Sequence, residues 1–137
     1  MKTELLIAAL LLGAAPLVTV TAADKAAAAK QNAVKRVDVE QFDKLRANHQ
    51  NLVLDVRTEK EFKAGHIPGA INIDVNGPEF ERKIAKLDKS KTYLVHCAAG
   101  VRSAKACKKL TGAGFMDLYD LAPGFRGWEK AGKPIEK

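Results

Sequence analysis

The sequence is poor in cysteine and in aromatic side chains: only two cysteines and 6% Phe, Trp and Tyr occur among its 137 residues. It contains no Cys-x-x-Cys pair, which excludes a resolving cysteine for thiol redox chemistry beside the first thiol. No His, Cys, Asp and Glu residues recur with the spacing of a metal site. The sequence therefore contains no pattern typical of a metal site.

Positive charge exceeds negative charge, and the formal net charge is +7. The lysines and arginines are nevertheless spread among acidic residues, without a long basic block and without interleaved aromatic side chains. This distribution argues against nucleic-acid binding. A moderately basic surface instead favours a small anionic substrate.

The N-terminal segment is not expected to belong to the fold. A long uncharged run ends in small residues at Ala22, which is typical of a secretory signal peptide, residues 1–22. An alanine- and lysine-rich tether, residues 23–33, then leads into one domain, residues 34–137. The sequence thus predicts a periplasmic or secreted protein with no stable membrane association after cleavage. Retention of the uncharged run as an N-terminal membrane anchor is the alternative.

Strand-like and helix-like segments alternate through the domain. The expected strands are 34–37, 52–56, 70–73, 91–96 and 115–119. Capping boxes predict helices that begin after Asp38 and Thr58, the second of which should end at Gly65. Further helices are expected from Pro78 and over 103–111 and 124–131. This alternation predicts an α/β fold with a central parallel sheet of about five strands and helices on both faces. In such folds ligands bind beyond the carboxyl ends of the strands.

One cysteine lies at such a strand end. Cys97 directly follows the apolar segment 91–96 and precedes the predicted helix, whose N–H groups and dipole favour a thiolate. Gly100 gives the intervening loop freedom to turn its N–H groups toward an anion, and Arg102 adds a permanent cation. Taken alone, these residues leave a reactive thiolate and an ordinary buried thiol equally open.

The second cysteine has a simpler interpretation. Cys107 falls on one face of the predicted helix together with Ala104, Leu110 and Thr111, which is typical of a core residue. It lies more than two helical turns beyond the loop that carries Cys97, farther than a disulfide usually reaches. We expect no bond between the two cysteines.

Four segments carry recognisable motifs across residues 34–135. They are Leu54-Asp55-Val56-Arg57 with Glu61-Phe62 after it, Gly65-His66-Ile67-Pro68-Gly69-Ala70-Ile71-Asn72-Ile73, the loop Cys97 to Arg102, and the stretch Leu121 to Pro134 with Gly124, Gly127, Trp128 and Gly132. In this order they resemble a single rhodanese domain, the sulfurtransferase family. Each motif alone is weak, and the ordered set is specific.

The resemblance implies a reaction and a set of site residues. Cys97 would attack the outer sulfur of thiosulfate or a similar small anionic donor and become a persulfide, and cyanide or a thiol would then take that sulfur. Arg102 would hold the oxygens of the donor. The terminal sulfur would be surrounded by backbone N–H groups of the loop, from Ala98, Ala99, Gly100, Val101 and Ser103. No cofactor is needed, and a protein sulfur acceptor stays open.

Three further residues are assigned supporting roles. Asp55 and Arg57 follow a strand, where they are expected to fix loops by hydrogen bonds, with Arg57 paired to Glu61. His66 lies in a turn and is expected to be hydrogen-bonded there rather than to act as a base. His96 precedes Cys97, so by strand alternation its side chain should face the opposite side of the sheet.

Other functions remain as alternatives. A cysteine phosphatase or arsenate reductase also uses a thiolate in an amide-lined loop, but Ala98 to Val101 are one residue fewer than its signature places before the arginine. A rhodanese-like module that carries or binds sulfur with little catalysis is the second alternative. Ala98 and Ala99 are small and neutral where some family members have a basic residue, which leaves room for a bulkier or less charged donor.

Overall fold

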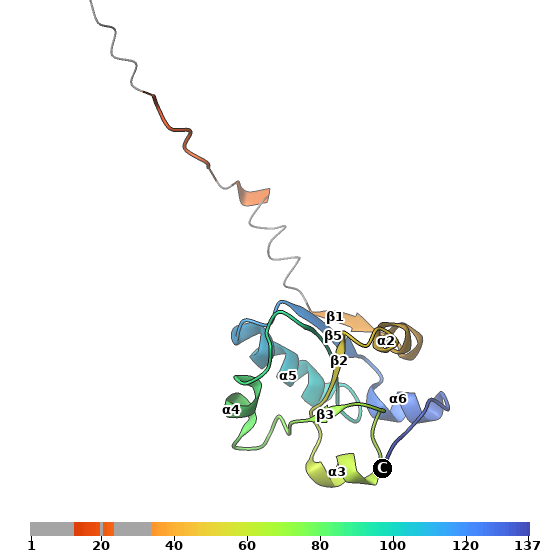
Figure 1. The fold of residues 1–137 in the computed structure, drawn as a ribbon. Coiled ribbons are helices and arrows are strands. Elements are labelled where there is room, and N and C mark those ends of the chain that lie inside the picture. The colour runs from red at the N-terminus through yellow and green to blue at the C-terminus, as the bar shows by residue number, and fades with distance from the viewer. Residues whose placement is uncertain (1–12, 20, 24–33) are drawn as a thin grey trace, which may run out of the picture.

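The computed structural model describes residues 13–19, 21–23 and 34–137 (Figure 1). Its elements, in chain order, are β1 (Lys35–Val37), α2 (Val39–Arg46), β2 (Leu52–Asp55), α3 (Glu59–Ala64), β3 (Ile71–Asn72), α4 (Phe80–Ile84), β4 (Thr92–His96), α5 (Val101–Gly112), β5 (Asp117–Leu121) and α6 (Gly124–Lys130). The strands form one sheet in the order β1-β5-β4-β2-β3, and every pairing is parallel. The expected α/β fold with a five-stranded parallel sheet is confirmed.

Strand β4 lies at the centre of the sheet, between β2 and β5. Its residues Tyr93, Leu94 and Val95 are completely buried because helices cover both faces of the sheet. Tyr93, Val95 and Cys97 join the core beneath α4 and α5, whereas Leu94 joins the core beneath α2 and α6. The alternation of β4 therefore sends the Cys97 side chain toward α5 and that of His96 toward the other face.

Two helices begin as the capping patterns predicted. Asp38 caps α2 by accepting the N–H of Gln41, and Thr58 caps α3 by accepting the N–H of Glu61. Gly65 ends α3, as expected. Helices α4 and α5 lie on one side of the sheet and α2 and α6 on the other (Figure 1).

Two predicted helix starts were wrong. Helix α5 begins at Val101 rather than Ser103, because Gly100 adopts a left-handed conformation that turns the chain directly into the helix. Helix α4 begins at Phe80 rather than at Pro78. The chain first makes a turn in which the Gly77 N–H donates to the Asp74 carbonyl and that of Phe80 to the Gly77 carbonyl.

Strand ends and one helix face also differ from expectation. Strand β5 begins at Asp117, since Phe115 is still bound to the end of α5 through its N–H on the Leu110 carbonyl. Strand β3 is reduced to Ile71–Asn72 at the edge of the sheet. Ala104 and Thr111 are exposed, and Ala106 takes the core position beside Cys107 and Leu110.

Most of the predicted signal peptide and of the tether lies outside the described residues. Leu17 and Val18, which the structure does describe, are almost completely exposed. Within residues 13–19, 21–23 and 34–137, no helix has the length and apolar character needed to cross a membrane.

Candidate active site

Cys97 lies one residue beyond the end of β4, where the chain leaves the sheet and turns toward α5. Its side chain is 1% exposed and packs in the core beneath α5. The neighbouring strands β2 and β5 end at the same edge, since all pairings are parallel. The thiol therefore stands at the carboxyl edge of the sheet, where α/β folds bind their ligands.

The Cys97 sulfur is surrounded by hydrogen-bond donors. The Gly100 N–H donates to Sγ across 3.1 Å, and the Ser103 hydroxyl oxygen lies 3.5 Å from Sγ. Burial raises the pKa of the thiol, but hydrogen bonds from the Ser103 hydroxyl and from the N–H groups of Ser103, Ala99 and Gly100 outweigh it. The net effect lowers the pKa of Cys97, and so favours the thiolate form relative to an ordinary buried thiol.

Two glycines allow the loop to fold against its neighbours. Gly100 has a φ of 89°, and a Cβ there would lie 2.4 Å from the Ala122 carbonyl oxygen. Gly124, at the start of α6, has a φ of 64°, and its Cβ would lie 2.4 Å from the Ala98 carbonyl oxygen. Both positions combine a left-handed backbone with close contact, so both require glycine.

Helix α6 holds the other side of the same loop. The Phe125 N–H donates to the Cys97 carbonyl at 2.8 Å, and the Arg126 N–H donates to the Ala98 carbonyl at 3.0 Å. These are N–H groups at the start of a helix that would otherwise lack partners. The loop carbonyls thus point toward α6, which leaves loop N–H groups free to face the sulfur.

Arg102 is engaged by a carboxylate rather than free. Its Nη1 and Nη2 donate to Oε1 and Oε2 of Glu61 at 2.7 and 2.9 Å, a bidentate pair. The Arg102 guanidinium lowers the pKa of Glu61 to about 2. The predicted pairing of Arg57 with Glu61 is therefore wrong: the α3 carboxylate reaches across to α5, 41 positions along the chain.

Arg57 instead belongs to a buried cluster with Asp55. Its Nε and Nη2 donate to the Asp55 carboxylate, and Nη2 also donates to the Gly65 carbonyl at 2.8 Å. His96 approaches the same carboxylate from β4, with Nε2 3.6 Å from Asp55 Oδ2. Burial lowers the pKa of His96, although Asp55 opposes the shift, and so favours the neutral ring. This cluster ties β2 to the end of α3, the structural role expected of Asp55 and Arg57.

His66 lies away from the sulfur. Its ring stacks on Phe62 with centroids 3.8 Å apart, and Nδ1 lies 2.9 Å from the Phe62 carbonyl oxygen. Its backbone exchanges two hydrogen bonds with Glu136, one in each direction. His66 joins the C-terminal segment to α3 through an antiparallel bridge, so it is hydrogen-bonded as expected but does not lie in the turn, which is formed by Pro68 and Gly69.

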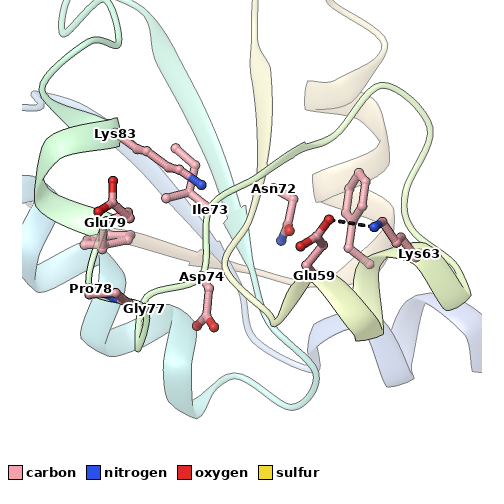
Figure 2. Close-up of a pocket in the computed structure, with 11 residues that line it drawn as sticks. Glu59, Lys63, Asn72, Ile73, Asp74, Gly77, Pro78, Glu79 and Lys83 are labelled. Atoms are coloured by element: carbon pink, nitrogen blue, oxygen red, sulfur yellow. Dashed lines mark ion pairs between the residues drawn. The ribbon is translucent and has the colours of Figure 1, made fainter.

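A pocket of about 290 Å³ opens beside the Cys97 loop. Its lining includes Ala98, Arg57, Glu61, Arg126 and Glu129, so both signs of charge stand at the mouth. A larger pocket of about 480 Å³ lies between α3 and α4 (Figure 2) and does not include the Cys97 loop. We take the smaller pocket as the candidate entrance, because its lining includes Ala98, the residue that follows Cys97, whereas the larger pocket is lined by no residue of the loop.

Cys107 has the opposite character to Cys97. It is buried and unbonded, and burial raises its pKa to about 12. Cys97 is also unbonded, so the expectation of no disulfide is confirmed. Among the described residues, no three His, Cys, Asp or Glu side chains come together as a group that could hold a metal ion.

The rhodanese-like domain family matches residues 38–131, which is most of the chain. The chain belongs to this family. A rhodanese-related protein from Thermoplasma volcanium has the same fold, with a TM-score of 0.66 at 30% identity, covering 74% of this chain and 97% of that one. The resemblance seen in the four sequence motifs is thereby confirmed.

Two relatives of this rhodanese-like domain are named sulfurtransferases. Thiosulfate sulfurtransferase 16, chloroplastic, of Arabidopsis thaliana is 36% identical over 104 residues, covering 69% of this chain and 85% of the relative. Thiosulfate sulfurtransferase GlpE of Pseudomonas savastanoi is 38% identical over 95 residues, covering 69% and 86%. These relatives support a sulfurtransferase kind of activity.

Sequence reasoning missed three contributors to the site of this rhodanese-like domain. The sequence indicates a capping role for Glu61 and a pairing with Arg57, and neither points to its role as the partner of Arg102. Nothing in the sequence indicates that the N–H groups at the start of α6 donate to carbonyls of the Cys97 loop. Asp120 is an acidic residue within strand β5, which is a signal in the sequence; it is 1% exposed and lies beside Val95, two residues before Cys97.

Proposed function

We propose that the protein is a sulfurtransferase that moves a sulfane sulfur from thiosulfate or a similar donor to cyanide or a thiol through a Cys97 persulfide. The observation that carries the proposal is the buried Cys97 sulfur, which accepts the Gly100 N–H at 3.1 Å and lies 3.5 Å from the Ser103 hydroxyl oxygen. Hydrogen bonds that favour the thiolate also favour a persulfide anion, because both place negative charge inside the same loop.

The reaction consists of two displacements at sulfur. The Cys97 thiolate attacks the sulfane sulfur of thiosulfate, an Sγ–S bond forms, and the bond to the sulfonate sulfur breaks, so that sulfite leaves with its electron pair. Cyanide or an acceptor thiolate then attacks the outer sulfur, and the Cys97 thiolate leaves. The products are thiocyanate or the persulfide of the acceptor, and neither displacement needs an outside oxidant.

The pocket beside the loop supports a small donor. Its volume of about 290 Å³ accommodates a few non-hydrogen atoms beside Ala98, the residue that follows Cys97. Arg126 is exposed at its rim and Glu61 occupies Arg102, so the donor would meet Arg126 before it meets Arg102. A protein acceptor with a surface thiol remains compatible with this open entrance.

An intact-mass measurement tests the proposal directly. The mature protein is incubated with thiosulfate, and we expect a gain of one sulfur atom that cyanide removes. Cys97→Ser should show no gain, whereas Cys107→Ser should still show it, since that thiol is buried with a pKa of about 12. Absence of an adduct with any sulfane donor, or an adduct that persists in Cys97→Ser, would overturn the proposal.

A sulfur carrier with little turnover is the second candidate. It is favoured by the pairing of Arg102 with Glu61 and by the neutral side chains of Ala98 and Ala99, which leave the loop without an unpaired cation of its own among the described residues. Stoichiometric loading of Cys97 with sulfur but negligible steady-state formation of thiocyanate would identify a carrier. Sustained turnover would identify the enzyme.

We further propose that residues 1–22 direct export and are removed after Ala22. The support is the uncharged run that ends in small residues at that position. N-terminal sequencing of protein recovered from the exported fraction should begin at Ala23. A sequence that begins at Met1 in a membrane fraction would instead identify a retained anchor.

A further inference from the structure

A groove lies between α5 and the edge of the sheet that β1 forms. Its lining includes Ala104, Cys107, Lys108 and Thr111 on the helix, with Arg36 and Asp120 on the strands. Its volume of about 450 Å³ is within the range of small-molecule sites. It shares no lining residue with the pocket beside the Cys97 loop, so it is separate from the candidate active site.

The helix side of the groove is a face of α5 that the fold covers only in part. Its four residues recur every three or four positions, so they lie on one face of the helix. Cys107 is 2% exposed, whereas Ala104, Lys108 and Thr111 are exposed. The Thr111 hydroxyl already donates to the Cys107 carbonyl at 2.8 Å. The helix and the half-buried Val34 therefore offer mainly apolar surface to a ligand.

The strand side of the groove contains a buried carboxylate. Asp120 pairs in register with Val95 of β4, which belongs to the core beneath α5, so both side chains lie on the α5 side of the sheet. Asp120 is 1% exposed. Arg36 Nε lies 3.4 Å from its Oδ2, whereas Oδ1 has no hydrogen-bond partner among the described residues. Since such an oxygen is costly to bury, a donor supplied from the groove would stabilise it.

We propose that this groove binds a small apolar molecule that donates one hydrogen bond, from an uncharged hydroxyl or N–H group, to the Asp120 carboxylate. Its apolar body would lie against Val34 and the exposed face of α5. A cationic donor is disfavoured, because Arg36 already pairs with the carboxylate and the exposed Lys108 adds positive charge to the lining. This site goes beyond the proposed sulfur transfer and does not depend on it.

Titration of the ¹⁵N-labelled protein with phenol, followed through its backbone amide signals, tests the proposal. Phenol has an apolar ring and one hydroxyl donor, whereas fluorobenzene has nearly the same size and no donor. We expect phenol to cause saturable shifts at Ala104, Lys108 and Thr111. Benzylammonium should bind more weakly than phenol, because positive charge already lies beside the carboxylate.

A substitution at Asp120 tests the role of the carboxylate. Asp120→Leu keeps a similar side-chain size without an acceptor, so the preference for phenol over fluorobenzene should fall about tenfold, the effect of losing a hydrogen bond to a charged group. Asp117→Leu is the control. Asp117 lies on the same strand, pairs with Lys35 and Thr92 and does not line the groove, so this variant should keep the preference of the parent protein.

A substitution on α5 keeps the test decisive if Asp120→Leu folds poorly. Ala104→Leu, at an exposed helical position, should fill the groove and abolish binding of both compounds. Ala85→Leu, exposed at the end of α4 and outside the lining, should not.

Three results would overturn the proposal. They are shifts that do not saturate or that map to another pocket, binding that survives Ala104→Leu, and a preference for phenol that survives Asp120→Leu. Tighter binding of benzylammonium than of phenol would contradict the uncharged donor. No sulfur donor is present in these titrations, so their failure is distinct from a failure to form the Cys97 persulfide.

Discussion

The ion pair between Arg102 and Glu61 neutralises the arginine that follows the Cys97 loop. Glu61→Gln would keep the capping of α3, since glutamine also serves at that position, but would release Arg102 from its bidentate partner. We expect KM for thiosulfate to fall about threefold to tenfold, since a free guanidinium binds an anion better than a neutralised one. Steady-state kinetics with thiosulfate and cyanide measure the change.

Two variants control this result. Glu59→Gln removes an exposed carboxylate from the same helix, paired with Lys63 (Figure 2), and should leave KM unchanged. Arg102→Ala should weaken use of the donor more than use of the acceptor. If Glu61→Gln leaves KM unaltered, then Arg102 does not contact the donor.

Both the backbone conformation and the close packing at position 100 require glycine. Gly100→Ala would place a methyl group 2.4 Å from the Ala122 carbonyl oxygen at a φ of 89°. We expect a loss of at least about 2 kcal/mol in the free energy of unfolding, together with loss of persulfide formation. Urea denaturation measures the first effect and intact mass the second.

The matched control is Gly112→Ala, at the end of the same helix. Nothing lies within 4 Å of its Cβ position, and its φ is not positive, so it should stabilise the protein by up to about 1 kcal/mol. Equal losses in the free energy of unfolding of both variants would show that replacement of any glycine, and not the contact at Gly100, causes the effect.

Only some residues of the candidate site could be predicted from the sequence. Cys97, Gly100 and Arg102 stood out because a strand end, a glycine and a cation occur together within six positions. Their partners did not stand out, because Glu61 and Phe125 approach from other elements at long separations along the chain. A local sequence pattern indicates the candidate reactive group, whereas the tertiary fold determines which residues form hydrogen bonds and ion pairs with that segment.

At the scale of elements, α6 holds the Cys97 loop through its first turn. Gly124→Ala would direct a methyl group to 2.4 Å from the Ala98 carbonyl oxygen and push α6 away from the loop. The hydrogen bonds from Phe125 and Arg126 to the loop would then lengthen. We expect sulfur transfer to fall by at least about tenfold, since small displacements of catalytic groups carry large costs. Single-turnover persulfide formation is the measurement.

Gly132→Ala provides the comparison for this variant. Its φ of 70° is similarly strained, but nothing lies within 4 Å of its Cβ position. It should cost about 1 kcal/mol of stability while leaving sulfur transfer intact. Similar losses of sulfur transfer in both variants would show that α6 does not position the Cys97 loop.

The order and type of the elements were predictable, whereas their ends were not. Apolar runs such as β4 and capping boxes at Asp38 and Thr58 are local signals, and the structure contains both as expected. The start of α5 depends on the left-handed turn at Gly100, which packs against Ala122. The start of α4 depends on the turn at Asp74 and Gly77. Contacts between elements set such helix starts, and the hydrophobic periodicity of the sequence does not indicate them.

At the scale of the whole molecule, the sheet separates two chemical environments. One face of β4 carries Cys97 toward the donors of α5, and the other carries His96 into a core with Phe42, Phe125 and Trp128. Within the described chain, His96 Nε2 has no hydrogen-bond partner. The fold therefore keeps an acid-sensitive group in its centre, close to the Asp55–Arg57 cluster that braces the site.

This arrangement predicts how stability depends on pH. Burial lowers the pKa of His96 below its ordinary value of 6.5 in the folded state, although Asp55 opposes the shift. The unfolded chain therefore binds more protons as the pH falls below about 6.5, and the free energy of unfolding must decrease there. Glu61, with a pKa of about 2, adds a second loss only as the pH falls below about 4.5.

Thermal unfolding between pH 8 and pH 4 resolves these contributions. The parent protein should begin to lose stability below about pH 6.5, before the carboxylates protonate. His96→Gln should be less stable at pH 8 through lost packing, yet its melting temperature should stay nearly constant down to about pH 5. His49→Gln, at an exposed position, should keep the parent profile. If His96→Gln retains the decline below pH 6.5, the acid sensitivity arises elsewhere in the molecule, and the neutral state assigned to His96 has no effect on folding.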